Sequence, residues 1–257
     1  MPESESSSAA YVRIATVEDL DELAAMKQRA FISSRPQNFL AGATSPLTTD
    51  PTHAKRRAHQ TEYLKFVIRR SWSMSARITV VILPGKPDKI VGAAIWGPPG
   101  QTTAPPMSSA LEMGLSSVIA NWGIGFLTRQ SEFVQSTEHV LAEAHAERKL
   151  PGSPEDAWHL QLAAVDSEFQ GKGYMSMLLR EGLEHAPGAV FTLEANSPQS
   201  RDVYGRYGFE VVREVIVGKG KVDGLAVVAS GDAATGFTMY PMIKVPRSKT
   251  EPEELQD

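Results

Sequence analysis

Residues 165–175 read Val165-Asp166-Ser167-Glu168-Phe169-Gln170-Gly171-Lys172-Gly173-Tyr174-Met175. This segment joins an apolar strand pattern to an amphipathic helix pattern expected over about 171–185. The start of a helix leaves backbone N–H groups unpaired and carries the positive end of the helix dipole, so a pyrophosphate fits such a turn. Gly171 and Gly173 would let the backbone approach the phosphates closely. The spacing alone is also that of a plain glycine-containing helix start, so it needs support from elsewhere in the chain.

Two common phosphate-binding motifs do not explain this turn. No G-x-x-x-x-G-K-[ST] sequence occurs, which excludes a Walker-type P-loop. The third glycine of a Rossmann fingerprint is missing, and the strand comes late in a chain without a long parallel-sheet pattern.

Apolar patterns on either side of the turn predict an α/β (α+β) fold. The intervals 32–52 and 218–236 are expected to be loops, the second one long and mobile. The first expected helix begins after the N-cap residue Thr16. Further helices are expected over 52–71, over 108–149 with a break at 123–125, over 171–185, and over a short segment that ends near Tyr207. The expected strands are 11–14, 77–83, 89–96, 158–165, 189–193, 209–217 and 237–245.

The composition, with 42% hydrophobic and 22% charged residues, is that of an ordinary globular protein. The net charge of −4 argues against a nucleic-acid partner, and no apolar run approaches the roughly 20 residues that a membrane span needs. The absence of cysteine excludes thiolate chemistry, and the histidines show no ligand spacing, so no metal is expected. Residues 1–10 and 247–257 are polar and are expected to be disordered tails of one domain at 11–246, with no secretory signal, which favours the cytoplasm.

A second motif follows the turn in the sequence. It reads Ser200-x-x-x-Tyr204-x-x-x-Gly208-Phe209 and comes after the strand expected at 189–193. The first segment resembles motif A of the GNAT (Gcn5-related N-acetyltransferase) superfamily, Q/R-x-x-G-x-G/A, with Gln170 and Gly173 at matching positions. The second segment resembles motif B of the same superfamily, N/A-x-x-x-Y-x-x-x-G-F. The two motifs in this order, separated by a strand, make the resemblance specific.

The resemblance implies the GNAT fold, a mixed central sheet of about six to seven strands flanked by helices. It covers 158–245 and extends to 11–31, whereas 32–75 and 98–157 are expected to be helical insertions. Ala157-Trp158-x-Leu160 and Phe191-x-Leu193-Glu194 also look like puromycin N-acetyltransferase and its relatives. This likeness favours transfer of an acetyl group to the primary amine of a small molecule, by a monomer or homodimer with no nucleic-acid or membrane partner.

The resemblance also implies acetyl-CoA as the co-substrate. Pantetheine would lie beside the end of the 158–165 strand, and backbone N–H groups of the turn would hold the pyrophosphate. Ser197 is first of all a helix N-cap, with cofactor contact as its second possible role. The cofactor-binding residues implied are Ala163, Ala164, Val165, Gln170, Gly171, Lys172, Gly173, Tyr174, Met175, Ser197 and Ser200.

Three residues are candidates for proton transfer. Tyr204 stands at the family's general-acid position, and a phenol with a pKa near 10 suits protonation of a thiolate. His159 lies on the strand before the turn, and an imidazole with a pKa near 6.5 suits deprotonation of an amine. Glu194 is the rival base, or alternatively binds a cationic group of the substrate. If they have no catalytic role, Tyr204 is a packed tyrosine on a short helix and His159 is a hydrogen-bonded histidine of the core.

Met175 is the main departure from the family pattern, because it stands where glycine or alanine is usual. The pyrophosphate needs only the backbone N–H at this position, which methionine retains. This departure and the unassigned insertions leave open a non-catalytic acyl-CoA-binding or regulatory module. A third alternative is acylation of protein N-termini or lysines, which would need an open groove at the acceptor site.

Overall fold

The computed structural model describes residues 9–85, 88–100, 106–150 and 152–246, and the statements below concern these residues. The tails expected at 1–10 and 247–257 lie almost entirely outside them. Among the described helices, none is both long and apolar enough to cross a membrane.

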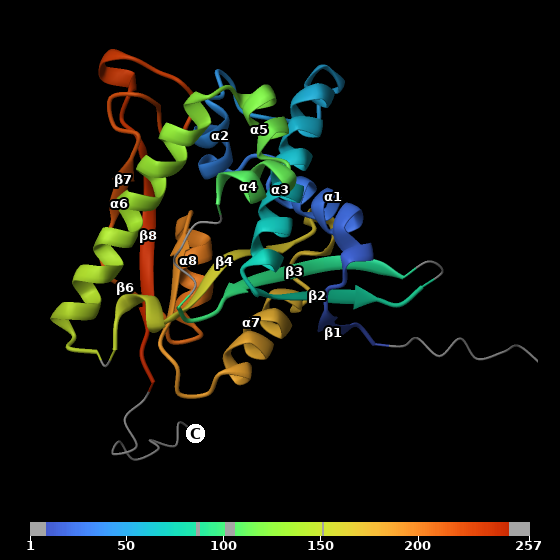
Figure 1. Cartoon of the computed structure of the whole chain (residues 1–257), viewed down its shortest axis with the longest axis vertical. Helices are drawn as coiled ribbons and strands as arrows, with labels where there is room; N and C mark the ends of the chain where they lie inside the picture. Colours follow the sequence, from blue (N-terminus) through green and yellow to red (C-terminus); the bar gives the residue numbers. More distant parts are fainter. Residues whose placement is uncertain (1–8, 86–87, 101–105, 151, 247–257) are drawn as a thin grey trace, which may run out of the picture.

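A mixed sheet of eight strands forms the centre of the fold (Figure 1). The strand order is β1-β2-β3-β4-β5-β8-β6, with β7 pairing with β8 beside β6. Every neighbouring pair is antiparallel except β4–β5, which is parallel. The α/β fold with a mixed sheet is therefore confirmed. The strands are β1 (Tyr11–Ile14), β2 (Arg77–Leu83), β3 (Lys89–Gly97), β4 (Trp158–Val165), β5 (Phe191–Ala195), β6 (Glu210–Val211), β7 (Val215–Val217) and β8 (Phe237–Lys244).

The strand expected at 209–217 is two short strands, β6 and β7, and this is why the sheet has one strand more than predicted. The interruption faces Pro241 on β8. Val212 donates its N–H to the carbonyl oxygen of Pro241, so the backbone of Pro241 faces β6 and β7. Because proline has no N–H, β8 cannot return that hydrogen bond, and the ladder breaks there.

Helices cover both faces of the sheet. Figure 1 shows α1 and α3 on one side of β2 and β3 and α7 on the other. Successive residues of β2 alternate between the two cores: Val80 and Ile82 pack beneath α1 and α3, and Val81 packs beneath α7. The helices are α1 (Leu20–Ala30), α2 (Arg35–Ala41), α3 (Ala54–Ser73), α4 (Met107–Glu112), α5 (Leu115–Trp122), α6 (Gly125–Glu147), α7 (Tyr174–His185) and α8 (Pro198–Gly205).

The interval 32–52 is not a simple loop, because it contains α2. Pro36 lies in the first turn of this helix, where its missing N–H has no intrahelical partner to lose. Gly42 ends the helix with a left-handed φ of 61°. The break expected at 123–125 is confirmed between α5 and α6, and Gly114, with a φ of 112°, adds a second break between α4 and α5.

The interval 218–236 is attached to α2 rather than projecting into solvent. Val222 and Ala226 are buried, and the side-chain amide of Asn38 donates to the carbonyl oxygen of Leu225 at 3.1 Å. Val228 donates its N–H to the carbonyl oxygen of Ala43 at 2.8 Å. These contacts do not fit the mobility expected from the sequence.

Gly182 on α7 provides a test of the packing beneath this helix. A Cβ at this position would collide with the indole ring of Trp96, which is fully buried and has little room to move. We expect Gly182→Ala to lower the free energy of unfolding by ~1–3 kcal/mol, measured by urea denaturation. Gly205→Ala is the matched control, because a Cβ there meets no atom within 4 Å. It should be neutral or gain ~0.5–1 kcal/mol. Equal effects of the two changes would contradict this account.

Candidate functional site

The parallel pairing of β4 with β5 ends early. It joins Trp158 with Phe191, His159 with Thr192, and Leu160 with Leu193, and no further pair is recorded among the described residues. On the other edge, Ile95 pairs with Leu162 and Trp96 with Leu160, so that Gln161 is an extra residue in β4. Bulges of this kind end pairing and redirect side chains. The edge of β4 that faces β5 is therefore open from Gln161 onward.

Ala163, Ala164 and Val165 lie on this open part of β4. Their opposite edge pairs with Ala94, Ala93 and Gly92 of β3, which holds the strand in place.

The turn after β4 is open at its glycines. Gly171 and Gly173 have φ values of 76° and 82°, and a Cβ at either would meet no atom within 4 Å. These values are incompatible with a regular helix, so α7 begins at Tyr174 rather than at 171 as expected. Gly173 is its N-cap, and no side chain caps the helix. Gln170 closes the turn by donating from Nε2 to the carbonyl oxygen of Val165 at 3.2 Å.

Two ammonium groups lie beside this turn. The Nζ atom of Lys172 is 4.9 Å from the ring centroid of Phe169, and that of Lys89 is 4.5 Å from the same ring. Lys172 adds positive potential next to the uncapped helix start, whereas the Nζ atom of Lys89 is paired with the carboxylate of Glu168 in the turn at 3.7 Å. Lys89 comes from β3, and nothing in the linear sequence associates it with the turn. The Met175 side chain packs toward the core beneath α7, so its bulk does not obstruct the turn.

Asp166 and Arg29 fix the start of the turn to α1. Asp166 is fully buried, and its Oδ2 atom accepts hydrogen bonds from Nε and Nη2 of Arg29 at 2.9 and 2.6 Å. Asp166 also donates its N–H to Val91 on β3 and accepts from the N–H of Phe169. The turn is thus held at its first residue by α1, by β3 and by its own backbone.

His159 and Glu194, predicted as rival bases, are in contact. The Nε2 atom of His159 lies 3.3 Å from a carboxylate oxygen of Glu194, and Nδ1 lies 2.9 Å from the hydroxyl of Thr192. Phe191 and Leu193 belong to the core beneath α7, so Thr192 and Glu194 face the other side of β5. Burial lowers the pKa of His159, but the Glu194 carboxylate, through its charge and hydrogen bond, raises it above the usual value with a further contribution from Glu138.

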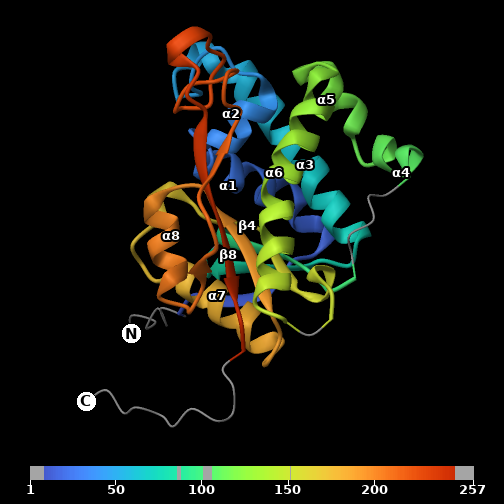
Figure 2. The same cartoon turned by 90° about the vertical axis from the view of Figure 1, so that its left-hand side faces the viewer.

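Glu138 is a member of this polar cluster that the sequence did not reveal. It lies on α6, which runs alongside β8 (Figures 1 and 2). Its pKa is raised, first by desolvation and next by the negative charge of Glu194, while His159 and Arg70 act in the opposite direction. The two carboxylates and the imidazole are therefore electrostatic neighbours, contributed by α6, β5 and β4.

Tyr204 is buried on α8, on the opposite face of the sheet. It belongs to the same apolar cluster as Leu160 and Leu193, the last residues paired before the strands separate. Burial raises the pKa of its phenol to about 12, and its ring meets Phe209 edge-on at 6.1 Å. Its hydroxyl has no hydrogen-bond partner among the described residues.

Ser197 and Ser200 form the reciprocal cap of α8. Ser200 donates its N–H to the Ser197 hydroxyl at 3.1 Å, and Ser197 donates its N–H to the Ser200 hydroxyl at 3.1 Å. This is the N-cap role expected first for Ser197. The Ser200 hydroxyl is therefore already engaged in the helix cap.

Comparison with known proteins agrees with this geometry. Residues 136–212 match the domain family described as acetyltransferase (GNAT) domain. This range runs from α6 through β4, the turn, α7, β5 and α8 to the end of β6. The matched part of the chain is therefore similar to GNAT acyltransferase domains, and it contains both sequence motifs.

Solved structures share the GNAT fold over nearly the whole chain. One is the histone acetyltransferase HPA2 and related acetyltransferase from Corynebacterium glutamicum, with 22% identity, a TM-score of 0.57, and coverage of 95% of this chain and 100% of that one. Another is arylalkylamine N-acetyltransferase 2 from Aedes aegypti, with 16% identity, a TM-score of 0.54, and coverage of 93% and 100%. No curated protein sequence matches the chain.

The structure brings most predicted site residues to the gap between β4 and β5. The open edge of β4 and the glycine turn form one continuous surface, and the His159–Glu194 pair and Tyr204 lie next to the gap on opposite faces of the sheet. Ser197 and Ser200 are instead engaged with each other in the cap of α8. No cluster of three or more metal-ligating side chains occurs among the described residues.

The Arg29–Asp166 pair predicts an asymmetric effect on stability. Arg29→Gln leaves Asp166 buried without its charged partner and should cost ~3 kcal/mol in the free energy of unfolding. Adding Asp166→Asn should recover part of this loss, because the unpaired charge is removed. Urea denaturation of the single and double variants measures both effects.

Lys65→Gln is the control for this pair, because its partner Asp21 is 83% exposed and the loss should stay below ~1 kcal/mol. A double variant less stable than Arg29→Gln would contradict the assignment.

Proposed function

We propose that this protein transfers the acetyl group of acetyl-CoA to the primary amine of a small molecule within a ternary complex. The observation that carries the proposal is the open edge of β4, which continues into an uncapped helix start lined by glycines. A pantetheine chain can join such an edge through its amides, as a peptide strand joins a sheet. Its pyrophosphate then reaches the backbone N–H groups of Gly171–Met175.

The chemistry needs a proton acceptor on one side of the gap and a proton donor on the other. The amine nitrogen attacks the thioester carbonyl carbon, the carbon–sulfur bond breaks, and an N-acetyl product and a thiol leave. His159, together with Glu194, takes the proton from the amine directly or through water. Tyr204 supplies the proton to sulfur. Its pKa of about 12 keeps it protonated at neutral pH, and the burial that raises it also favours a protonated thiol nearby.

A small acceptor suits the covered side of the sheet better than a protein does. The face that carries His159 and Glu194 lies on the side of α6, whose residue Glu138 is their electrostatic neighbour. The 218–236 segment is attached to α2 on the same side of the molecule (Figure 2). A protein chain would need an open groove where these elements lie.

The release of thiol tests this proposal directly. The protein is incubated with acetyl-CoA and a panel of small amines, and free thiol is followed together with the mass of each amine. We expect thiol release only with certain amines, each gaining one acetyl group. Binding of acetyl-CoA without release from any amine would favour the non-catalytic acyl-CoA-binding module instead.

Tyr204→Phe should lower kcat by about 10²-fold, the usual range for loss of a general acid. The KM for acetyl-CoA should change little, because the ring and its apolar contacts remain. Steady-state kinetics with an active amine measures both parameters, and Tyr207→Phe, just after the end of α8, is the control. Full activity of Tyr204→Phe across a pH series would exclude the phenol as proton donor.

Glu194→Gln should shift the acidic limb of kcat/KM to lower pH. The carboxylate raises the pKa of His159 whereas burial lowers it, so removing the charge lets this pKa fall. A base must be neutral to accept a proton, so activity should then appear at lower pH than in the parent protein. The same amine is used for both proteins, so its own titration cancels.

Glu143→Gln is the control for this series, because Glu143 is on α6 and pairs with His139 and Arg213 away from the site. If Glu194→Gln keeps both the acidic limb and the plateau of the kcat/KM profile of the parent protein, His159 is excluded as the base. A collapse of activity at every pH would assign that role to Glu194.

A further inference from the structure

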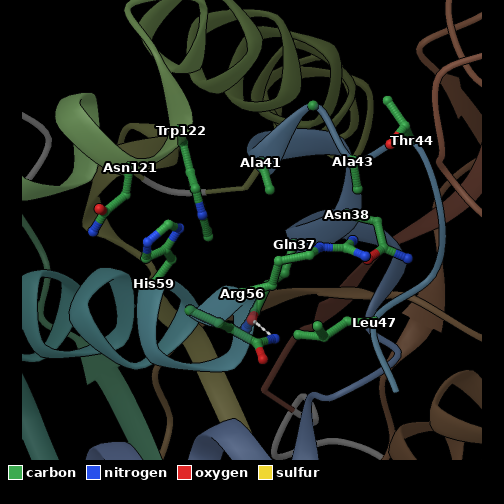
Figure 3. A pocket seen from close by; sticks show the side chains of 12 residues that line it. Gln37, Asn38, Ala41, Ala43, Thr44, Leu47, Arg56, His59, Asn121 and Trp122 are labelled. Carbon is green, nitrogen blue, oxygen red and sulfur yellow. Dashed lines mark hydrogen bonds between the residues drawn. The ribbon is translucent and has the colours of Figure 1, made fainter. Parts of the chain in front are cut away.

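A cavity of about 180 Å³ lies between α2, α3 and the end of α5, closed on one side by the chain that follows α2 (Figure 3). All its lining residues come from 37–60 and 121–122, outside the part of the chain that matches the GNAT domain. A cavity of roughly 150 Å³ can hold a benzene ring. The size therefore suits one ring with a small substituent.

Buried amides fix the chemistry of the cavity floor. Gln28 donates from Nε2 to Oε1 of Gln60 at 2.9 Å, and Gln60 donates from Nε2 to the carbonyl oxygen of Phe31 at 2.9 Å and to Oε1 of Gln37. Gln60 has then used its acceptor and both its hydrogens. Because Gln37 receives this bond on its oxygen, its own NH₂ group is left to donate, and it has no acceptor among the described residues.

Gln37 is only 6% exposed and lines the cavity. Its NH₂ group is therefore placed to donate a hydrogen bond to an acceptor inside the cavity.

The titratable groups that line the cavity are both basic, and Arg56 carries the positive charge because burial and Lys55 lower the pKa of His59. Arg56 and His59 line it, and no aspartate or glutamate does. Arg56 donates from Nη1 to the Ser45 hydroxyl at 3.0 Å and from Nη2 to the Ser45 carbonyl oxygen at 2.6 Å, which holds the guanidinium in place with further hydrogens to spare. His59 and Asn121 have no side-chain partner among the described residues. The cavity thus offers donors and a positive charge to an anion.

Trp122 provides an apolar surface for a ring. Figure 3 shows its side chain descending from α5 and that of His59 rising from α3 toward the same space. The Trp122 ring is held by Tyr63, with centroids 4.6 Å apart, and by Phe126 at 5.8 Å. Arg129 on α6 donates to the carbonyl oxygens of Leu40 and Trp122 at 2.9 and 3.1 Å, so α2 and α5 are joined and the cavity is preformed.

We propose that this cavity binds a small monocyclic carboxylate, whose carboxylate accepts hydrogen bonds from Gln37 and Arg56 while its ring packs on Trp122. The site is separate from the β4–β5 gap. Ser71 donates to Gln161, the bulged residue of β4, at 2.9 Å, and Gln60 lies about 16 Å from Ser71 along α3 at about 1.5 Å per residue. A ligand of this size cannot span that distance, so binding does not depend on the acetyl-transfer proposal.

Benzoate is the probe for this site, with benzamide and benzylamine as its neutral and cationic counterparts. Titration calorimetry on the full chain should give benzoate a dissociation constant of about 1 mM or tighter, with both counterparts at least about tenfold weaker. In ¹H–¹⁵N spectra, benzoate should shift the indole N–H signal of Trp122, identified by its loss in Trp122→Phe. The indole signals of Trp72, Trp96 and Trp158 should stay in place.

Arg56→Gln should weaken benzoate binding at least about tenfold. Arg57→Gln is the matched control, because Arg57 is its neighbour on α3, bonds the carbonyl oxygens of Thr48 and Asp50, and does not line the cavity. Gln37→Glu is the second variant, since it puts a negative charge in the cavity and should abolish benzoate binding while admitting benzylamine.

Three outcomes would overturn the proposal. They are no benzoate binding up to about 10 mM, equal affinity for benzoate and benzamide, and benzoate binding that survives both Arg56→Gln and Gln37→Glu. A cavity that holds only water would give the first of these results.

Discussion

The site depends on the point at which β4 stops pairing with β5. Two parallel strands normally satisfy each other's backbone groups along their shared length, and an unpaired buried N–H or carbonyl group is costly. Here the pairing ends at Leu160 and Leu193, and the bulge at Gln161 turns β4 away from its neighbour. The backbone groups beyond this point need another partner, and an extended ligand with amides can supply one. The catalytic candidates gather at the same place because the gap admits side chains from both faces.

Holding the gap open requires that β4 and the turn after it cannot move to close it. From Leu162 to Val165 the opposite edge of β4 is paired with β3, and Asp166 is fixed by Arg29 on α1 immediately after the strand. Gln170 then ties the turn back to Val165. The rigidity of the proposed cofactor surface thus comes from elements that do not themselves contact a ligand. The ion pair suits this purpose because the buried Asp166 carboxylate cannot lose its charged partner without a large cost in stability.

The sequence predicted the parts of the site that are local in the chain. Each of these parts is defined by residues close together in the chain: the glycine turn, the strand before it, and the second motif from Ser200 to Phe209. The two motifs were therefore enough to predict the GNAT fold. The contact between His159 and Glu194 depends on the register of a parallel strand pair, which no local pattern specifies, so the two residues looked like rivals. Glu138 and Lys89 reach the site from other elements and have no sequence signal. The break between β6 and β7 is caused by Pro241 on a different strand, and it could not be seen in 209–217 itself.

The position of β8 has a consequence for how the chain folds. This strand lies inside the sheet, between β5 on one side and β6 and β7 on the other, although it follows all of them in the sequence. During synthesis β5 therefore keeps one edge unpaired until the residues up to Lys244 have been made. An exposed strand edge is a template for pairing with other chains, so the nascent protein passes through a stage open to aggregation. The sheet closes only when its interior is filled by the last of its strands to be synthesised.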